Sequence, residues 1–140
     1  MDGIVTAQEA IHSLKMLKMK RMLIKLDLYK AYDRINWHYL IVVQRAFGFD
    51  DRWLQWLPSF ISSPNFSILL NGIPSQLFNI TRGLCQGDPL SPFLFILAAE
   101  GLGRLIKAHL VEGQLKGLKL WGTDVSLPHQ QFVDDILLFC

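Results

Sequence analysis

Hydrophobic and polar residues alternate from residue 22 to residue 28. Every second residue of this segment is apolar, and the intervening positions place Leu23, Lys25 and Asp27 on the other side. A period of two residues is typical of a β-strand with one face toward a core and one face carrying charge. The sequence therefore predicts a strand over 22–28, with Asp27 near its end.

The last ten residues predict a β-hairpin. Two mainly apolar runs, 131–133 and 136–140, flank the acidic pair Asp134 and Asp135. Because Asp favours turns, we expect both carboxylates at the tip of this hairpin. The second run ends without a turn or a cap. An open apolar strand edge invites aggregation, so we expect the chain to be part of a longer protein.

Four segments repeat apolar residues at helical spacing and begin near a capping residue. The predicted helices and caps are about 7–20 with Thr6 and Glu9, 37–47 with Asn36, about 51–61 with Asp50, and about 91–110 with Ser91. Gly48 is expected to end the second helix, and Pro58 to kink or shorten the third.

Further signals predict strands and one polar loop. Asn71-Gly72 separates 66–70 from 73–80 and suits the positive φ angles of a tight hairpin turn. Residues 116–121 predict another strand, and residues 81–88 a glycine-containing loop. Together the elements predict the α+β class, with a small antiparallel sheet backed by helices.

Composition excludes several classes of protein. The chain has 140 residues, which favours one domain or part of one, with 51% hydrophobic and 19% charged residues. This balance excludes a disordered tail, a mucin-like stalk and a basic nucleic-acid arm. Prolines and polar residues interrupt the uncharged stretch 54–81, so no membrane span is expected. Without a signal-peptide pattern, we expect an intracellular protein.

Positive charge gathers in the first third of the chain, although the net charge is only +2. Residues 1–45 hold eight Lys or Arg and four acidic residues. Two interpretations stay open for the basic cluster in this part of the chain. The first is that the cluster contacts phosphates, and the second is that it forms the solvated face of a helix and of the segment after it. The cluster consists of Lys15, Lys18, Lys20, Arg21 and Lys25.

The acidic pair is a candidate metal site. Two adjacent carboxylates in apolar surroundings resist desolvation unless a cation neutralises them, and oxygen ligands fit Mg²⁺ or Mn²⁺. Asp27, on the charged side of its strand, would complete a site with Asp134 and Asp135 for two such ions, which serve phosphoryl transfer. This reasoning leaves open a polymerase, a nuclease, or three unrelated acids on loops.

The loop that follows the Asn-Gly hairpin has features of an anion-binding segment. Gly83 and Gly87 permit close approach of the backbone, and a helix N-terminus follows. The Walker pattern of Lys and Ser or Thr is missing, so the loop by itself is a weak phosphate signal.

Three segments in this order resemble motifs A, B and C of reverse transcriptases. They are LDLYKAYDRINW (26–37), RGLCQGDPLSPFLFILAAEGL (82–102) and FVDDILLF (132–139). The likeness is to LINE-type (non-LTR) retrotransposons of plants, and it extends from about Ile11 to Cys140. The middle motif is the most specific. The resemblance implies an α+β polymerase palm that performs RNA-directed DNA polymerisation with Mg²⁺ or Mn²⁺ as cofactor.

The resemblance also implies partners and residue roles. The partners would be an RNA template, a DNA primer and deoxynucleoside triphosphates, and the element type suggests action in the nucleus. The implied metal ligands and catalytic residues are Asp27, Asp134 and Asp135; the nucleotide-binding residues are Tyr32, Gln86 and Gly87; the template or primer contacts are Arg82 and Gly83. Asp33 and Trp37 match positions with a structural role. Cys85 and Val133 depart from the common Arg and Ala.

On this resemblance, residues 1–140 are a partial reverse transcriptase domain, an incomplete palm without full fingers and without a thumb. Those segments would belong to a longer polyprotein. Because positioning supplies much of the rate in phosphoryl transfer, we expect little or no polymerase activity from the isolated chain. The alternatives are a catalytically inactive retrotransposon relic, a nucleic-acid interaction module, and a divalent-ion nuclease.

Overall fold

The computed structural model describes residues 3–16, 22–119, 126–132 and 135–139. The chain divides into two compact units. The first unit comprises Met1–Tyr29 and Glu100–Cys140, and the second comprises Lys30–Ala99. Helix α5 (Ser91–Val111) contributes its C-terminal part to the first unit and its N-terminal part to the second.

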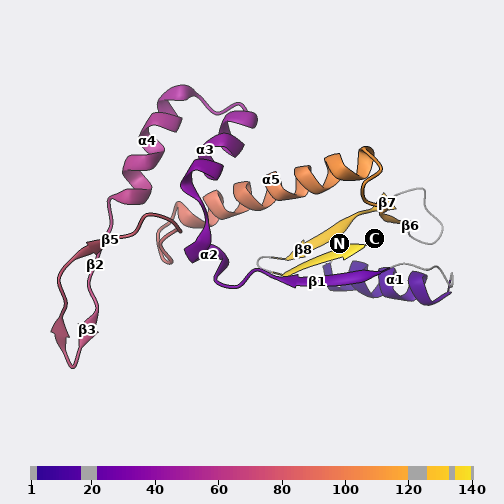
Figure 1. The fold of residues 1–140 in the computed structure, drawn as a ribbon, viewed down its shortest axis with the longest axis horizontal. Helices are drawn as coiled ribbons and strands as arrows, with labels where there is room; N and C mark the ends of the chain where they lie inside the picture. The colour runs from indigo at the N-terminus through magenta and orange to yellow at the C-terminus, as the bar shows by residue number, and fades with distance from the viewer. Residues whose placement is uncertain (1–2, 17–21, 120–125, 133–134, 140) are drawn as a thin grey trace. The chain divides into compact units, whose positions relative to one another are not determined.

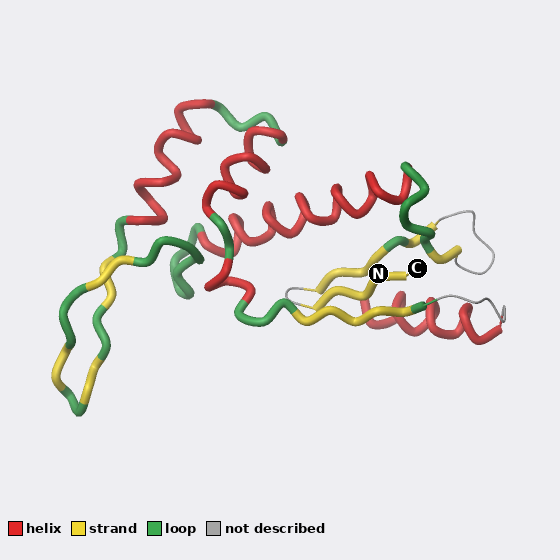
Figure 2. The backbone as a smooth tube through the Cα atoms, viewed as in Figure 1, coloured by secondary structure: helices red, strands yellow, loops and turns green. Residues whose placement is uncertain are grey.

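The first unit is built on a three-stranded antiparallel sheet with the order β1-β9-β8 (Figures 1 and 2). Strand β1 is Leu23–Asp27, β8 is His129–Phe132 and β9 is Asp135–Phe139. The predicted strand near residue 25 and the predicted C-terminal hairpin are therefore confirmed. Asp135 is the first residue of β9, and Asp134 lies outside the described residues.

Helices contact both faces of this sheet, so both faces carry apolar residues. Leu23 and Phe139 pack with Ala10 of helix α1 (Gly3–Met16) on one face. On the other face, His129 lies against Gly103 of α5. The prediction that a single face of β1 is buried was wrong. Leu23, on the charged face, joins the core because α1 covers that end of the sheet, whereas Leu26 is 40% exposed.

Two further predictions in this unit concern the start of the first helix and the strand over 116–121. Helix α1 begins at Gly3, so Thr6 and Glu9 do not cap it, and the predicted residues 17–20 lie outside the described part of the chain. Within the predicted strand 116–121, the structure shows β6 (Leu118–Lys119), which pairs with β7 (Ser126–Leu127), and residues 120–121 lie outside the described part of the chain.

The second unit contains three helices before α5, and two of them begin at the predicted caps. Helix α2 is Ala31–Arg34, α3 is Trp37–Ala46 and α4 is Asp51–Ser62. The Asn36 side chain accepts a hydrogen bond from Tyr39 N at 3.1 Å, and Asp50 accepts one from Arg52 N at 2.8 Å. These bonds satisfy backbone donors that have no partner inside the first helical turn.

Helix α4 continues past Pro58 to Ser62, so of the two effects predicted for Pro58, a kink or a shorter helix, the shortening does not occur. The residues on either side, Leu57 and Ile61, are buried in the core of the second unit. Their packing holds the last turn in place although Pro58 lacks a backbone N–H. The same core contains Leu40 of α3 and Leu94 of α5.

The predicted Asn-Gly hairpin is confirmed. Asn71 and Gly72 have φ angles of 52° and 83°, as a tight two-residue turn requires. Strand β3 (Leu69–Leu70) pairs with β4 (Ile73–Pro74) next to this turn, and β2 (Asn65–Phe66) pairs with β5 (Phe78–Asn79) farther from it. None of the described helices combines the length and the apolar character needed to cross a membrane.

Candidate active site

The sheet of the first unit brings two of the predicted carboxylates together. Asp27, the last residue of β1, pairs directly with Asp135, the first residue of β9. Residues that are directly opposite in an antiparallel pair project from the same face, with Cβ atoms about 5 Å apart. The two carboxylates therefore share one face and one end of the sheet, although 107 intervening positions separate them in the sequence.

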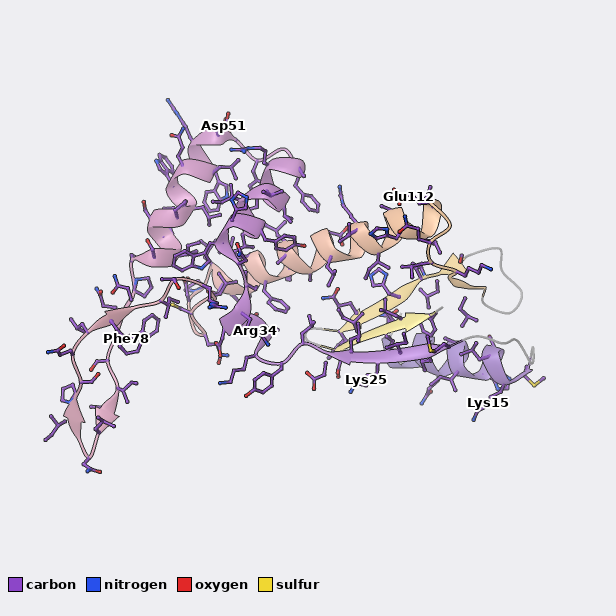
Figure 3. The ribbon with its side chains drawn as sticks, viewed as in Figure 1. Lys15, Lys25, Arg34, Asp51, Phe78 and Glu112 are labelled. Carbon is purple, nitrogen blue, oxygen red and sulfur yellow. The ribbon has the colours of Figure 1, made fainter. Side chains whose placement is uncertain are left out.

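A lysine lies beside these carboxylates on the same face. Lys25, two residues before Asp27 on β1, places its Nζ atom 2.9 Å from Oδ1 of Asp135. Figure 3 labels Lys25 on β1. The side chains of Lys25 and Asp135 are 63% and 45% exposed, so water screens their attraction. Like charges on directly opposite residues repel, and Lys25 offsets part of that repulsion.

The donor set fits a hard divalent cation in its chemistry. Asp27 and Asp135 supply carboxylate oxygens, the ligands that Mg²⁺ prefers. Within residues 3–16, 22–119, 126–132 and 135–139, no group of three His, Cys, Asp or Glu residues is placed to hold a metal ion. Asp134, the third predicted ligand, lies outside these ranges.

The register adds one residue that the sequence analysis treated only as an apolar flank. Phe132 of β8 pairs with Asp135 and so stands in the same cross-strand row as Asp27. Its side chain is 72% exposed. An exposed aromatic ring next to two carboxylates offers an apolar surface at this end of the sheet. The alternation of side chains along β8 determines the face on which Phe132 lies, but only the pairing of β8 with β9 places Phe132 beside Asp135.

In the second unit, the glycine-containing loop is attached to the segment around α2 by backbone hydrogen bonds. Gly83 N donates to Ile35 O at 2.8 Å, and Leu84 N donates to Tyr32 O at 2.9 Å. The indole Nε1 of Trp37 donates to Gly83 O at 2.7 Å, which gives Trp37 a structural role. Three hydrogen bonds thus join residues 83–84 to residues 32–37.

Gly83 is the closest point of this contact. Its φ angle is 86°, in the left-handed region, and a Cβ atom there would lie 2.6 Å from the carbonyl oxygen of Asp33. Any side chain at this position would therefore collide with backbone. Gly87 has a φ of 95°, but a Cβ atom there would meet nothing within 4 Å. The backbone contact and the positive φ thus both favour glycine at position 83, whereas at position 87 only the positive φ does.

The remaining predicted residues of the loop lie at the surface, and Tyr32 is half-buried. Arg82, Gln86 and Gly87 are exposed. The Tyr32 ring stacks on Phe95, with ring centroids 4.4 Å apart and planes inclined by 1°. That stacking fixes the orientation of the Tyr32 ring.

A cavity of about 440 Å³ opens beside this loop within the second unit. Arg82 and Gln86 line it together with Asp33 and Phe66, which the sequence analysis did not assign to a site. Cys85 also lines the cavity. Burial and the nearby Asp88 carboxylate raise the pKa of the Cys85 thiol, so this side chain is not an activated nucleophile.

The sequence of this chain matches the model of a known protein family over its whole length. A family model described as reverse transcriptase (RNA-dependent DNA polymerase) matches residues 1–140. The chain belongs to the reverse transcriptase family. Two of the segments that resemble this family's motifs contain Asp27 and Asp135, which pair in the first unit, and the third contains the loop of the second unit.

Curated relatives point to non-LTR retrotransposons. An uncharacterised mitochondrial protein of Arabidopsis thaliana is 42% identical over 67 residues, which are 48% of this chain and 55% of the relative. A Pol polyprotein from the type-1 retrotransposable element R2 of Popillia japonica is 32% identical over 94 residues, 65% of this chain and 16% of that protein. The predicted relationship to LINE-type elements is confirmed. The chain spans about half of the first relative and a sixth of the second.

A solved structure shares the fold. Apo telomerase from Candida tropicalis, truncated from its C-terminal domain, matches with a TM-score of 0.64 at 17% identity, over 98% of this chain and 28% of that chain. This likeness confirms the predicted α+β, palm-like fold.

Proposed function

We propose that residues 1–140 act as the palm of an RNA-directed DNA polymerase in which Asp27, Asp134 and Asp135 hold Mg²⁺ or Mn²⁺. The observation that carries the proposal is the direct pairing of Asp27 with Asp135 at one end of the sheet. Membership of the reverse transcriptase family supports it. Enzymes of this family generally use divalent metals.

Asp27, Asp134 and Asp135 would hold the divalent ions at the end of the sheet, and the ions would supply activation of a primer 3′-hydroxyl and stabilisation of charge on the transferring phosphate. Asp27 is exposed, so a primer end could reach this site from solvent. Phe132, exposed in the same row, offers an apolar contact for a sugar or a base at this end. The sheet contributes a rigid register, because both carboxylates belong to hydrogen-bonded strands.

We assign nucleotide contacts to Tyr32, Gln86 and Gly87, and template or primer contact to the segment Arg82-Gly83. The stacking of Tyr32 on Phe95 supports a fixed wall against which the sugar of a nucleotide would lie. The exposed Arg82 guanidinium suits a phosphate. Gly83 is buried, so its own contribution is to hold the loop, and Arg82 beside it makes the contact.

Cation binding tests the metal site. Mn²⁺ titrations followed by electron paramagnetic resonance are expected to show binding by the chain and a large loss of affinity in Asp27→Asn. Asp51→Asn, which removes an exposed carboxylate from α4 in the other unit, is the matched control and is expected to bind as the unmodified chain does. Equal affinity of Asp27→Asn and the unmodified chain would overturn the metal site.

Polymerase activity is tested in a chimera, because we expect little activity from the isolated 140 residues. The chain replaces its matching segment in the R2 polyprotein of Popillia japonica, and deoxynucleotide incorporation is measured on a primed RNA template. Synthesis that Asp27→Asn abolishes supports the proposal. A chimera that folds and binds template without synthesis supports the interaction module or relic. Mg²⁺-dependent cleavage of the template without need for deoxynucleotides indicates the nuclease.

A further inference from the structure

Lys25 occupies an unusual place on the sheet. It lies in the middle of β1, where its direct partner across the strands is Leu137, yet its Nζ atom reaches diagonally to Asp135 Oδ1 at 2.9 Å. It shares its face with Asp27, because the two residues are two positions apart on one strand. The Lys25 ammonium group therefore lies on the same face as the carboxylates of Asp27 and Asp135 and contacts the second of them.

The ion pair contributes little to the fold. Its two side chains are about half exposed or more, and pairs of this kind add little to stability because water competes for both charges. Five paired positions already join β1 and β9 through their backbones. The consequence of the ion pair therefore lies in the local charge at the end of the sheet.

An ammonium group and a divalent cation make opposing demands on the same carboxylate. Each lowers the repulsion between Asp27 and Asp135, but the lysine group repels a second cation and occupies an oxygen that a metal ion would use. An ion that takes Oδ1 of Asp135 must displace Lys25 first.

We propose that Lys25 is a built-in counter-ion of the site, which pairs with Asp135 when no metal is bound and competes with the divalent cation for that carboxylate. The inference rests on the proposed metal site and goes beyond it, because it assigns a positioning role to a residue outside the ligand set. Lys25 keeps the carboxylates together before the ion arrives, at a cost in affinity.

Mn²⁺ affinity measured by isothermal titration calorimetry tests the inference without any activity assay. Lys25→Met is expected to bind Mn²⁺ about two- to fivefold more tightly than the unmodified chain, the effect of removing one solvent-exposed ion pair. Lys25→Arg keeps the charge and is expected to bind as the unmodified chain does. Raising the salt concentration should shrink the difference, since salt screens exposed charges.

The matched control is Lys15→Met, which removes one positive charge from an exposed position of α1 in the same unit. Figure 3 labels both lysines. An equal gain in Lys15→Met and Lys25→Met would trace the effect to net charge and overturn the inference. Unchanged or weaker binding by Lys25→Met, with normal binding by the unmodified chain, overturns the inference and leaves the metal site standing. No binding by either protein overturns both.

Discussion

The end of the sheet that carries Asp27 and Asp135 differs from the loop around Gly83 in how its side chains are held. At the sheet end, backbone pairing of β1 with β9 sets the geometry, while the Asp27 side chain is exposed and that of Asp135 is half-buried. In the loop, Gly83 is buried and meets the backbone of Asp33, and Trp37 donates to it from the neighbouring helix.

The difference separates residues that serve chemistry from residues that serve structure. A carboxylate at the end of a strand can be replaced without opening the core when, like Asp27 and Asp135, it does not belong to a buried apolar cluster. A glycine pressed against backbone cannot be replaced without moving that backbone. We therefore expect substitutions in the loop mainly to lower the stability of the fold. Substitutions at the sheet end should mainly weaken cation binding. Substitutions in each region can test this contrast.

The largest effect is expected for Gly83→Ala. The new Cβ atom would meet Asp33 O at 2.6 Å and would also require a left-handed backbone. We expect a loss of about 2–5 kcal/mol in the free energy of unfolding, from the strained backbone plus the collision. Denaturant unfolding followed by tryptophan fluorescence measures it, because Trp37, Trp53 and Trp56 lie in the second unit.

Gly87→Ala is the matched control for this prediction, since Gly87 has a similar φ angle but open space around it. Only the backbone cost of about 1–2 kcal/mol is expected there. Equal losses in the two variants would show that the contact with Asp33 adds nothing.

Trp37→Phe is expected to have a smaller effect. It removes the indole donor of the 2.7 Å hydrogen bond and leaves the carbonyl of Gly83 without that partner. We expect a loss of about 1 kcal/mol, typical of one hydrogen bond, plus a contribution from the smaller ring. Chemical denaturation monitored by circular dichroism at helix wavelengths measures the loss. An unchanged midpoint would mean that water replaces the indole.

At the sheet end, Asp27→Asn should leave stability within about 0.5 kcal/mol of the unmodified chain, because it relieves repulsion with Asp135. The same substitution should weaken Mn²⁺ binding about tenfold or more, since even changes around metal ligands cost that much. Thermal melting and Mn²⁺ titration of one preparation measure the two effects together. A strongly destabilised Asp27→Asn would remove the contrast between the two regions.

The smallest effect concerns His129, on the face of the sheet opposite to the carboxylates. Burial lowers the pKa of His129 from its ordinary 6.5, the charge of Lys107 lowers it further, and Glu100 opposes the shift. Because the folded protein disfavours the protonated ring, this contribution to stability is present above the ordinary pKa. It is lost as the pH falls through the lowered pKa.

Melting temperatures between about pH 8 and pH 5 measure this effect. The unmodified chain should lose more stability toward the acid end than His129→Gln, which cannot take up a proton there. Parallel curves for the two proteins would mean that protonation of His129 is not linked to folding.

The sequence predicted much of the fold because the local signals are strong. Alternation over 22–28 predicted β1, and Asn71-Gly72, Asn36 and Asp50 predicted a turn and two caps that the structure contains. Predictions failed where packing outweighs a local rule. Pro58 does not end α4, since neighbouring buried residues hold the helix. Thr6 does not begin α1, because the helix already starts at Gly3 and Thr6 lies inside it.

For the candidate site, the sequence supplied the chemistry of the residues. Motif spacing singled out Asp27, Asp135 and the loop glycines, because carboxylates and glycines have properties that hold in any fold. Phe132, Lys25 and Asp33 drew no assignment to the site, since each acquires a possible role only from its neighbours.

The amino-acid sequence by itself determined the family, the main helices and strands, and the residue types available for binding a metal. Only the tertiary structure decided that Asp27 faces Asp135, that Lys25 bridges to it and that Gly83 touches Asp33. The physical reason is that helices and tight turns arise from neighbours in the chain. Strand register and close backbone contact are fixed by segments many residues apart, whose pairing depends on the packing of the whole unit.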